Sequence, residues 1–145
     1  GRETEMAITG APAPAGYSGT PLRRKLGVVP GQRTLRHAMP ASVAAEIDDG
    51  APPPDGTPPW DMVQLFCDRR AELEALLVRL RGELSPKGMI WASWPKKASK
   101  VPTDITEDTI RAIALPLGFV DVKVCAVNAV WSGLKLVIRV SERQG

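Results

Sequence analysis

The residues that could do chemistry are concentrated in one stretch, SWPKKASKVPTDITED, at positions 93–108. Its three lysines could bind a phosphate or a carboxylate as point charges; they are Lys96, Lys97 and Lys100. The same stretch offers an aromatic stacking face, two hydroxyl groups and a carboxylate, at Trp94, Ser99, Thr103 and Asp104. A following helix N-terminus would add backbone donors. The stretch therefore predicts a binding site for a small anionic or polar molecule.

A second interpretation of this stretch is a solvated loop. Its lysines could pair with nearby acids, at Asp104, Glu107 and Asp108. Exposed pairs of this kind contribute only about 0 to 1 kcal/mol each. Site and loop remain equal alternatives.

Two residues suggest acid–base or nucleophilic chemistry. His37 is the only histidine and is expected near the carboxyl end of the first strand, the edge at which open α/β sheets bind ligands. An imidazole side chain can gain and lose a proton near neutral pH, which suits proton transfer. Cys67 is expected at the end of the second strand and could act as a nucleophile with His37 as its base. The sequence shows no third residue to orient that dyad, and a lone histidine or a buried free cysteine is more often structural.

A third polar cluster is YSGTP, at positions 17–21, which holds the only tyrosine, Tyr17, beside Ser18. It lacks the lysine of a P-loop, so that type of phosphate site is excluded. A cap before a short helix is the simpler interpretation, and Tyr17 and Ser18 stay candidate ligand-binding residues. Cys67 and Cys125 show no Cys-x-x-Cys spacing, so neither a metal site nor a cofactor is predicted.

Composition predicts one domain. The chain has 145 residues, of which 43% are hydrophobic, enough for a single core. Residues 1–16 are expected to be a flexible leader or an expression-vector remnant, and residues 17–145 the domain, with a proline-rich surface loop at 48–59. The sequence has no apolar run of membrane-spanning or signal-peptide type, which predicts a cytoplasmic protein without a membrane partner.

Charge argues against a nucleic-acid partner. The net charge of +3 and the pI near 9.1 are modest, and aromatic residues make up only 5%. The segment from Leu22 to Arg36 contains five basic residues and no acid, which a solvated face explains as well as a binding surface does. A protein partner or a homo-oligomer stays open.

The hydrophobic pattern alternates between strands and helices. We expect helices at 20–27, 41–49, 69–84 and 106–118, with Asp68 and Thr106 as N-caps, and strands at 32–38, 60–67, 89–94, 119–127 and 134–140. The tetrapeptide SPKG at 85–88 is expected to end the preceding helix and to form a turn before the third strand. The last two strands suit a hairpin. The order predicts a three-layer α/β fold whose sheet is mostly parallel, with a C-terminal antiparallel hairpin.

Several longer motifs of the sequence resemble motifs of known protein families. The segment GELSPKGMIWASW, with the order of elements around it, is similar to the C-terminal half of Rossmann-type S-adenosylmethionine methyltransferases. The motifs GYSGTPLRRKLG, WPKKASKVPTDITED, LPLGFVDVKVCAV and WSGLKLV resemble a family of short bacterial proteins known only as a domain of unknown function. This second resemblance covers about residues 16–140 and implies a truncated Rossmann-like sheet, but no activity.

The chain departs from the methyltransferase pattern where the cofactor would bind. A glycine-rich turn should follow the first strand, yet no glycine occurs between Gly31 and Gly50, and too few residues precede Trp60 for the missing strands. No S-adenosylmethionine site is expected.

The leading hypothesis is a domain that binds a small anionic or polar ligand, or a partner. The alternative is a small cofactor-independent enzyme of a biosynthetic pathway, in which His37 is the acid or base and the lysines stabilise developing negative charge. A third hypothesis is a protein interaction module.

Overall fold

One five-stranded sheet organises the protein. A computed structural model describes residues 21–48 and 50–143. The strand order is β1-β2-β3-β5-β4, with bounds Thr34–His37, Trp60–Phe66, Leu84–Pro95, Trp131–Ile138 and Phe119–Ala126 in that order. The β1, β2 and β3 strands are parallel, and β5 pairs antiparallel with both β3 and β4. The predicted α/β class and the C-terminal hairpin are confirmed.

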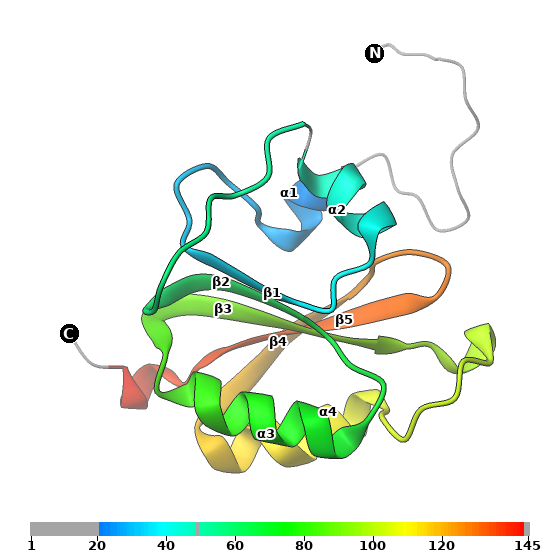
Figure 1. The fold of residues 1–145 in the computed structure, drawn as a ribbon. Coiled ribbons are helices and arrows are strands. Elements are labelled where there is room, and N and C mark those ends of the chain that lie inside the picture. Colours follow the sequence, from blue (N-terminus) through cyan, green and yellow to red (C-terminus); the bar gives the residue numbers. More distant parts are fainter. Residues whose placement is uncertain (1–20, 49, 144–145) are drawn as a thin grey trace.

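Helices cover both faces of the sheet. On one face lie α1 and α2, Leu22–Leu26 and Ala41–Asp48, and on the other lie α3 and α4, Arg70–Arg81 and Glu107–Ala114 (Figure 1). Short 3₁₀ turns η1, η2 and η3 span Lys97–Ser99, Leu115–Leu117 and Val140–Glu142. The α1 helix stops at Gly27, where φ is 78°, a left-handed conformation that favours glycine. Its N-cap residue is Pro21.

Successive side chains of a strand point to opposite faces of the sheet, so the hydrophobic core consists of two clusters, a larger one on the face of α3 and α4 and a smaller one on the face of α1 and α2. Val63 and Leu65 of β2 face the larger cluster, with α3 and α4, whereas Met62 and Phe66 face the smaller cluster, with α1 and α2. Burial on both faces explains why the β2 sequence is a nearly continuous apolar run.

The turn predicted at residues 85–88 is wrong, because these residues belong to strand β3. The pairing of β2 with β3 shifts register between Trp60 and Met62, which places an irregularity beside the SPKG segment. A Cβ at Gly88 would lie 2.6 Å from the backbone oxygen of Trp60. Glycine therefore permits a close backbone approach at this position instead of a turn.

The start of α3 also differs from the prediction. Arg69 rather than Asp68 is the N-cap residue, and the Oδ1 atom of Asp104 accepts a hydrogen bond of 2.6 Å from the Arg70 N–H. A residue that is distant in sequence thus supplies the acceptor that Asp68 was expected to provide. The predicted cap of α4 is confirmed, since Thr106 forms a capping box with Thr109.

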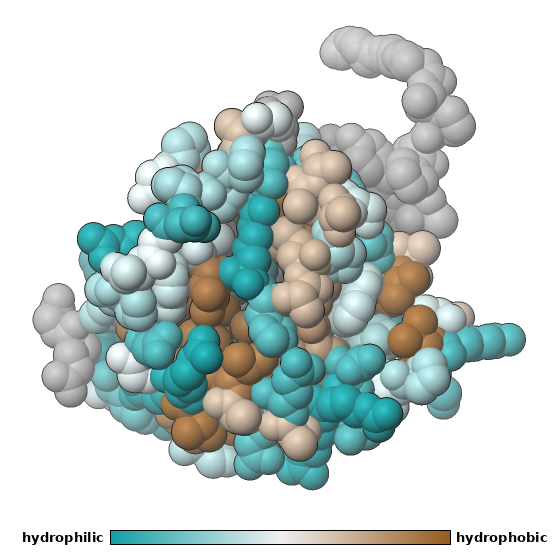
Figure 2. Space-filling model, viewed as in Figure 1, coloured by the Kyte–Doolittle hydropathy of each residue, from teal (hydrophilic) through white to brown (hydrophobic). Residues whose placement is uncertain are grey.

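Within the described residues, no helix is long and apolar enough to cross a membrane. In the view of Figure 2, hydrophobic side chains show between hydrophilic ones without covering the face.

Candidate functional site

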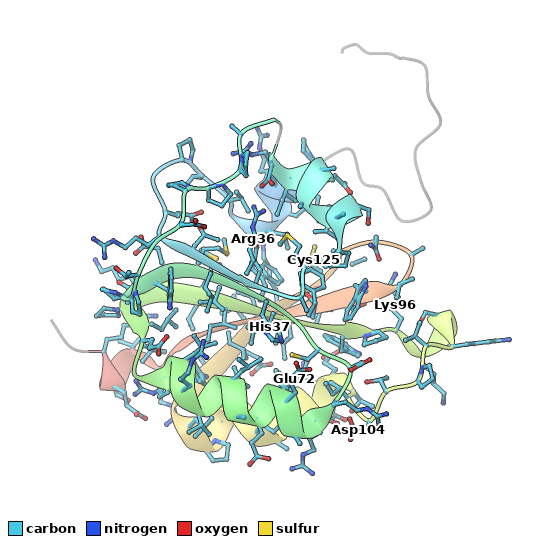
Figure 3. The ribbon with its side chains drawn as sticks, viewed as in Figure 1. Arg36, His37, Glu72, Lys96, Asp104 and Cys125 are labelled. Atoms are coloured by element: carbon cyan, nitrogen blue, oxygen red, sulfur yellow. The ribbon has the colours of Figure 1, made fainter. Side chains whose placement is uncertain are left out.

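The β1 strand places two neighbouring polar residues on opposite faces of the sheet. Arg36 reaches Asp48 at the end of α2, and His37 reaches Glu72 in α3. Figure 3 shows Arg36 on the α1 and α2 side, and His37 and Glu72 on the other side. Two separate groups of polar residues result, one on each face.

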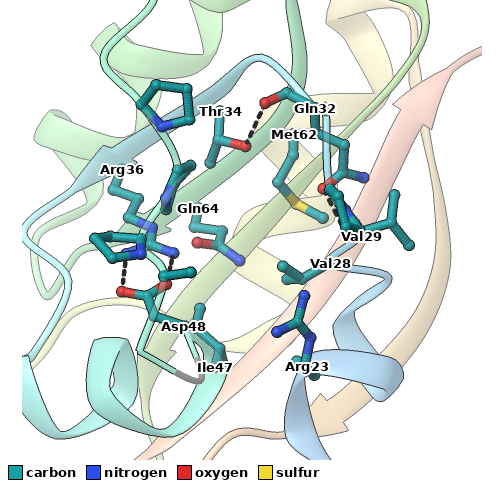
Figure 4. Close-up of a pocket in the computed structure, with 16 residues that line it drawn as sticks. Arg23, Val28, Val29, Gln32, Thr34, Arg36, Ile47, Asp48, Met62 and Gln64 are labelled. Atoms are coloured by element: carbon teal, nitrogen blue, oxygen red, sulfur yellow. Dashed lines mark hydrogen bonds and ion pairs between the residues drawn. The ribbon is translucent and has the colours of Figure 1, made fainter.

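The first group lines a cavity of about 340 Å³. Its floor consists of Thr34 and Arg36 from β1 and Met62 and Gln64 from β2 (Figure 4). Its walls are α1, the segment 28–32 that follows it, the end of α2 and the prolines at 52–54. The proline-rich loop predicted at 48–59 therefore forms one wall.

Gln64 is the most unusual residue of the cavity. It is 2% exposed, and neither its Nε2 nor its Oε1 has a hydrogen-bond partner among the described residues. Its neighbour in β3, Trp91, donates its indole N–H to the Leu26 backbone oxygen at 2.7 Å, so that donor is already used. Buried amides are nearly always hydrogen-bonded, and this one is directed into the cavity (Figure 4).

Arg36 is held beside Gln64 by an ion pair. Its Nη1 donates to Asp48 Oδ2 at 3.0 Å, and its Nη2 donates to Asp48 Oδ1. The hydrogen bonds from Arg36 hold the pKa of Asp48 below its usual value, although burial opposes the shift. The buried Nε of Arg36 has no partner within the described part of the chain. Two residues that line the cavity, Arg36 and Gln64, thus carry buried polar atoms without a hydrogen-bond partner in the described part of the chain.

The second group lies at the carboxyl edge of the sheet, on the face of α3. His37 ends β1, and Cys67 directly follows β2, as predicted. His37 Nε2 lies 2.9 Å from Glu72 Oε2, and one side-chain atom from each of His37, Cys67 and Glu72 lies within 4.8 Å of the others. The sequence interpretation missed Glu72; its place in the first turn of the helix after Cys67 was the available signal.

The environment of Cys67 disfavours a nucleophile. Cys67 is 1% exposed. Burial raises the pKa of its thiol to about 12, and the negative charges of Glu72 and Asp68 contribute to the rise. A thiol with this pKa is protonated at neutral pH and attacks poorly. Proximity to His37 alone therefore does not make an active dyad.

The lysine stretch follows β3 as predicted. Lys97 and Lys100 are exposed, and Lys96 is partly buried. The Ser99 side chain stabilises the η1 turn in which it lies. Its Oγ donates to the Lys96 backbone oxygen at 2.6 Å and accepts a hydrogen bond from the Val101 N–H. Trp94 is 8% exposed and belongs to the larger core cluster, so its ring presents little surface for stacking.

The acids near these lysines have other partners. Asp104 binds the Arg70 N–H, whereas Glu107 and Asp108 pair with Arg111. Within the described ranges, no ion pair joins the three lysines to these acids. The lysine–acid pairs considered under the solvated-loop interpretation are therefore absent among the described residues. Tyr17 and Ser18 lie outside the described residues.

Comparisons with known proteins give a distant structural similarity. No family model and no curated protein matches the chain. Among solved structures, the chain is similar to the PH0226 protein from Pyrococcus horikoshii OT3, at 9% identity and a TM-score of 0.46, over 73% of this chain and 72% of that one. The resemblance to a family of short bacterial proteins stays a prediction.

Proposed function

We propose that this protein binds a small polar or anionic molecule in the cavity between α1, α2 and the sheet. The supporting observation is Gln64, whose side chain is buried in the cavity floor and whose two amide atoms have no hydrogen-bond partner among the described residues. A buried amide without partners destabilises a protein by about 1 to 3 kcal/mol. A ligand that restores the hydrogen bonds accounts for a glutamine at this position.

The residues that line the cavity indicate which chemical groups the ligand carries. Gln64 offers one donor and one acceptor side by side, and the Nε of Arg36 offers a further, positively charged donor. Arg23 also lines the cavity and adds positive charge, while Val28, Ile47 and Met62 provide apolar contacts. The ligand therefore carries an amide-like donor and acceptor pair, a further acceptor or anionic group, and an apolar part. The volume is at the small end of the range for ligand pockets, about 300 to 1,000 Å³.

We also propose that the fold is a truncated relative of the Rossmann sheet that lacks the usual S-adenosylmethionine site. The proposed cavity lies over the face of β1 and β2 that α1 and α2 cover, whereas sequence patterns assigned the site to the carboxyl edge of the sheet. Acid–base catalysis by His37, anion binding by the lysine stretch and protein docking stay predictions.

A ligand screen with one apolar variant tests the proposal. Thermal unfolding is measured with a library of small polar metabolites for the wild type and for Gln64→Leu. Leucine removes an unpaired amide at similar volume, so the free variant should be more stable than the wild type by about 1 to 3 kcal/mol. A ligand at a hundred times its Kd should stabilise the wild type by about 2.7 kcal/mol and the variant much less.

His37→Ala is the matched control, because His37 neighbours Arg36 but faces the opposite side of the sheet. It should keep the full ligand-induced shift. The proposal fails if no compound stabilises the wild type, or if Gln64→Leu destabilises the free protein and keeps the same shift.

A further inference from the structure

We propose that His37, Cys67 and Glu72 form a binding site for a zinc-like transition-metal ion. This site lies on the α3 face of the sheet, so it is separate from the cavity of Gln64 and Arg36. It does not depend on the function proposed above.

The three side chains converge from three elements. His37 is the last residue of β1, Cys67 follows the last residue of β2, and Glu72 lies in the first turn of α3. One ligand-type atom from each lies within 4.8 Å of the other two. The His37 and Glu72 atoms are 2.9 Å apart.

The donor set suits zinc. Imidazole, thiolate and carboxylate are all zinc ligands, and bonds of about 2.0 to 2.3 Å place the ligand atoms of a tetrahedral site roughly 3.3 to 3.8 Å apart. The His37–Glu72 separation of 2.9 Å is shorter than that range and the other separations are at most 4.8 Å, so adjustments of about 1 Å or less in the side chains would complete the site. A thiolate with an imidazole favours zinc or a similar transition metal over magnesium or calcium.

Burial gives the cluster a floor and an opening. The thiol of Cys67 is at the base, since the residue is 1% exposed, while the His37 and Glu72 side chains are 33% and 44% exposed. An ion held by these three ligands would keep one coordination position toward solvent. Three protein ligands with one open position are typical of catalytic rather than structural zinc sites.

Neighbouring structure fixes the ligands and adds charge. The Cys67 N–H donates to the Ser93 backbone oxygen at 3.1 Å, which continues the pairing of β2 with β3. The first turn of α3, which carries Glu72, is held by the hydrogen bond between Asp104 and the Arg70 N–H. The carboxylate of Asp68 acts on Cys67 electrostatically and adds to the negative potential that attracts a cation.

Cobalt spectroscopy tests the site. Co²⁺ is added to the reduced, metal-free protein, and we expect a thiolate-to-cobalt charge-transfer band together with visible bands of tetrahedral intensity, both removed by Zn²⁺. Cys67→Ser should abolish the charge-transfer band. His37→Ala and Glu72→Ala should keep it but weaken the cobalt affinity at least about tenfold; both residues are partly exposed, so these variants also serve if Cys67→Ser does not fold.

Cys125→Ser is the matched control, because Cys125 packs against the smaller cluster on the other face. It should keep the thiolate-to-cobalt band and the cobalt affinity of the wild type. Gln64→Leu should keep both as well, regardless of the result of the ligand screen. The proposal is overturned if the wild type shows no thiolate band, or if Cys67→Ser keeps the band while Cys125→Ser loses it. It is also overturned if His37→Ala and Glu72→Ala bind cobalt as tightly as the wild type does.

Discussion

At the scale of single residues, the main feature is a polar side chain inside an apolar strand. Gln64 interrupts the run MVQLF in β2, between Met62 and Phe66 on the same face. A leucine there would bury more apolar surface and leave no unpaired group. Selection for stability alone does not favour glutamine at this position, which is why we assign it to ligand binding.

The Arg36–Asp48 pair gives a pH-dependent prediction. The pKa of Asp48 is lower in the folded protein than its usual value, mainly because Arg36 donates hydrogen bonds to it. The pair therefore contributes full stability above the unfolded pKa of about 3.9, and this contribution is lost as the pH falls through the lower folded pKa. Asp48→Asn should lower the free energy of unfolding at pH 7 by about 1.5 to 3 kcal/mol.

Urea unfolding between pH 7 and pH 2 measures this effect. The difference between wild type and Asp48→Asn should shrink below about pH 4. Asp55→Asn, an exposed position in the proline-rich loop, is the control and should change little. A difference that is constant with pH would show that the carboxylate charge of Asp48 does not stabilise the fold.

At the scale of elements, β1 and the start of α3 decide which residues meet. The four residues of β1 are all half-buried, so its sequence does not reveal which side chains face which layer. Arg36 and His37 therefore could not be assigned to faces from the pattern. The hydrogen bond that the Arg70 N–H of α3 donates to Asp104 could not be predicted either, because the two residues are 34 positions apart.

That hydrogen bond predicts a structural role for Asp104, which sequence patterns assigned to ligand binding. Asp104→Ala should destabilise the protein by about 0.5 to 2 kcal/mol, as loss of a helix N-cap does. Asp104→Asn keeps an acceptor oxygen and should retain most of the stability. Denaturant midpoints compare the three proteins, and equal midpoints for wild type and Asp104→Ala would contradict the capping role.

At the scale of the whole molecule, the layers were predictable and the cavity was not. Apolar residues at helical spacing in 69–84 and 106–118 and alternation in 119–127 and 134–140 predicted the elements and the C-terminal hairpin. The cavity depends on how the proline-rich segment and the loop 28–32 approach each other across β1 and β2, which no local pattern encodes. The one available signal was the glutamine in a strand that is nearly all buried.

The protein thus presents two polar groups on opposite faces of one sheet. Arg36 and Gln64 belong to the cavity, while His37, Cys67 and Glu72 belong to the proposed metal site. Because the sheet separates them, substitutions in one group should leave binding at the other unchanged.

The most direct test of the central claim is a crystal structure of the protein with the most stabilising compound from the ligand screen. We predict that the compound lies in the cavity, accepts a hydrogen bond from Gln64 Nε2 and donates one to Gln64 Oε1. A compound bound outside the cavity, with the Gln64 amide paired to water or protein atoms, would contradict the claim.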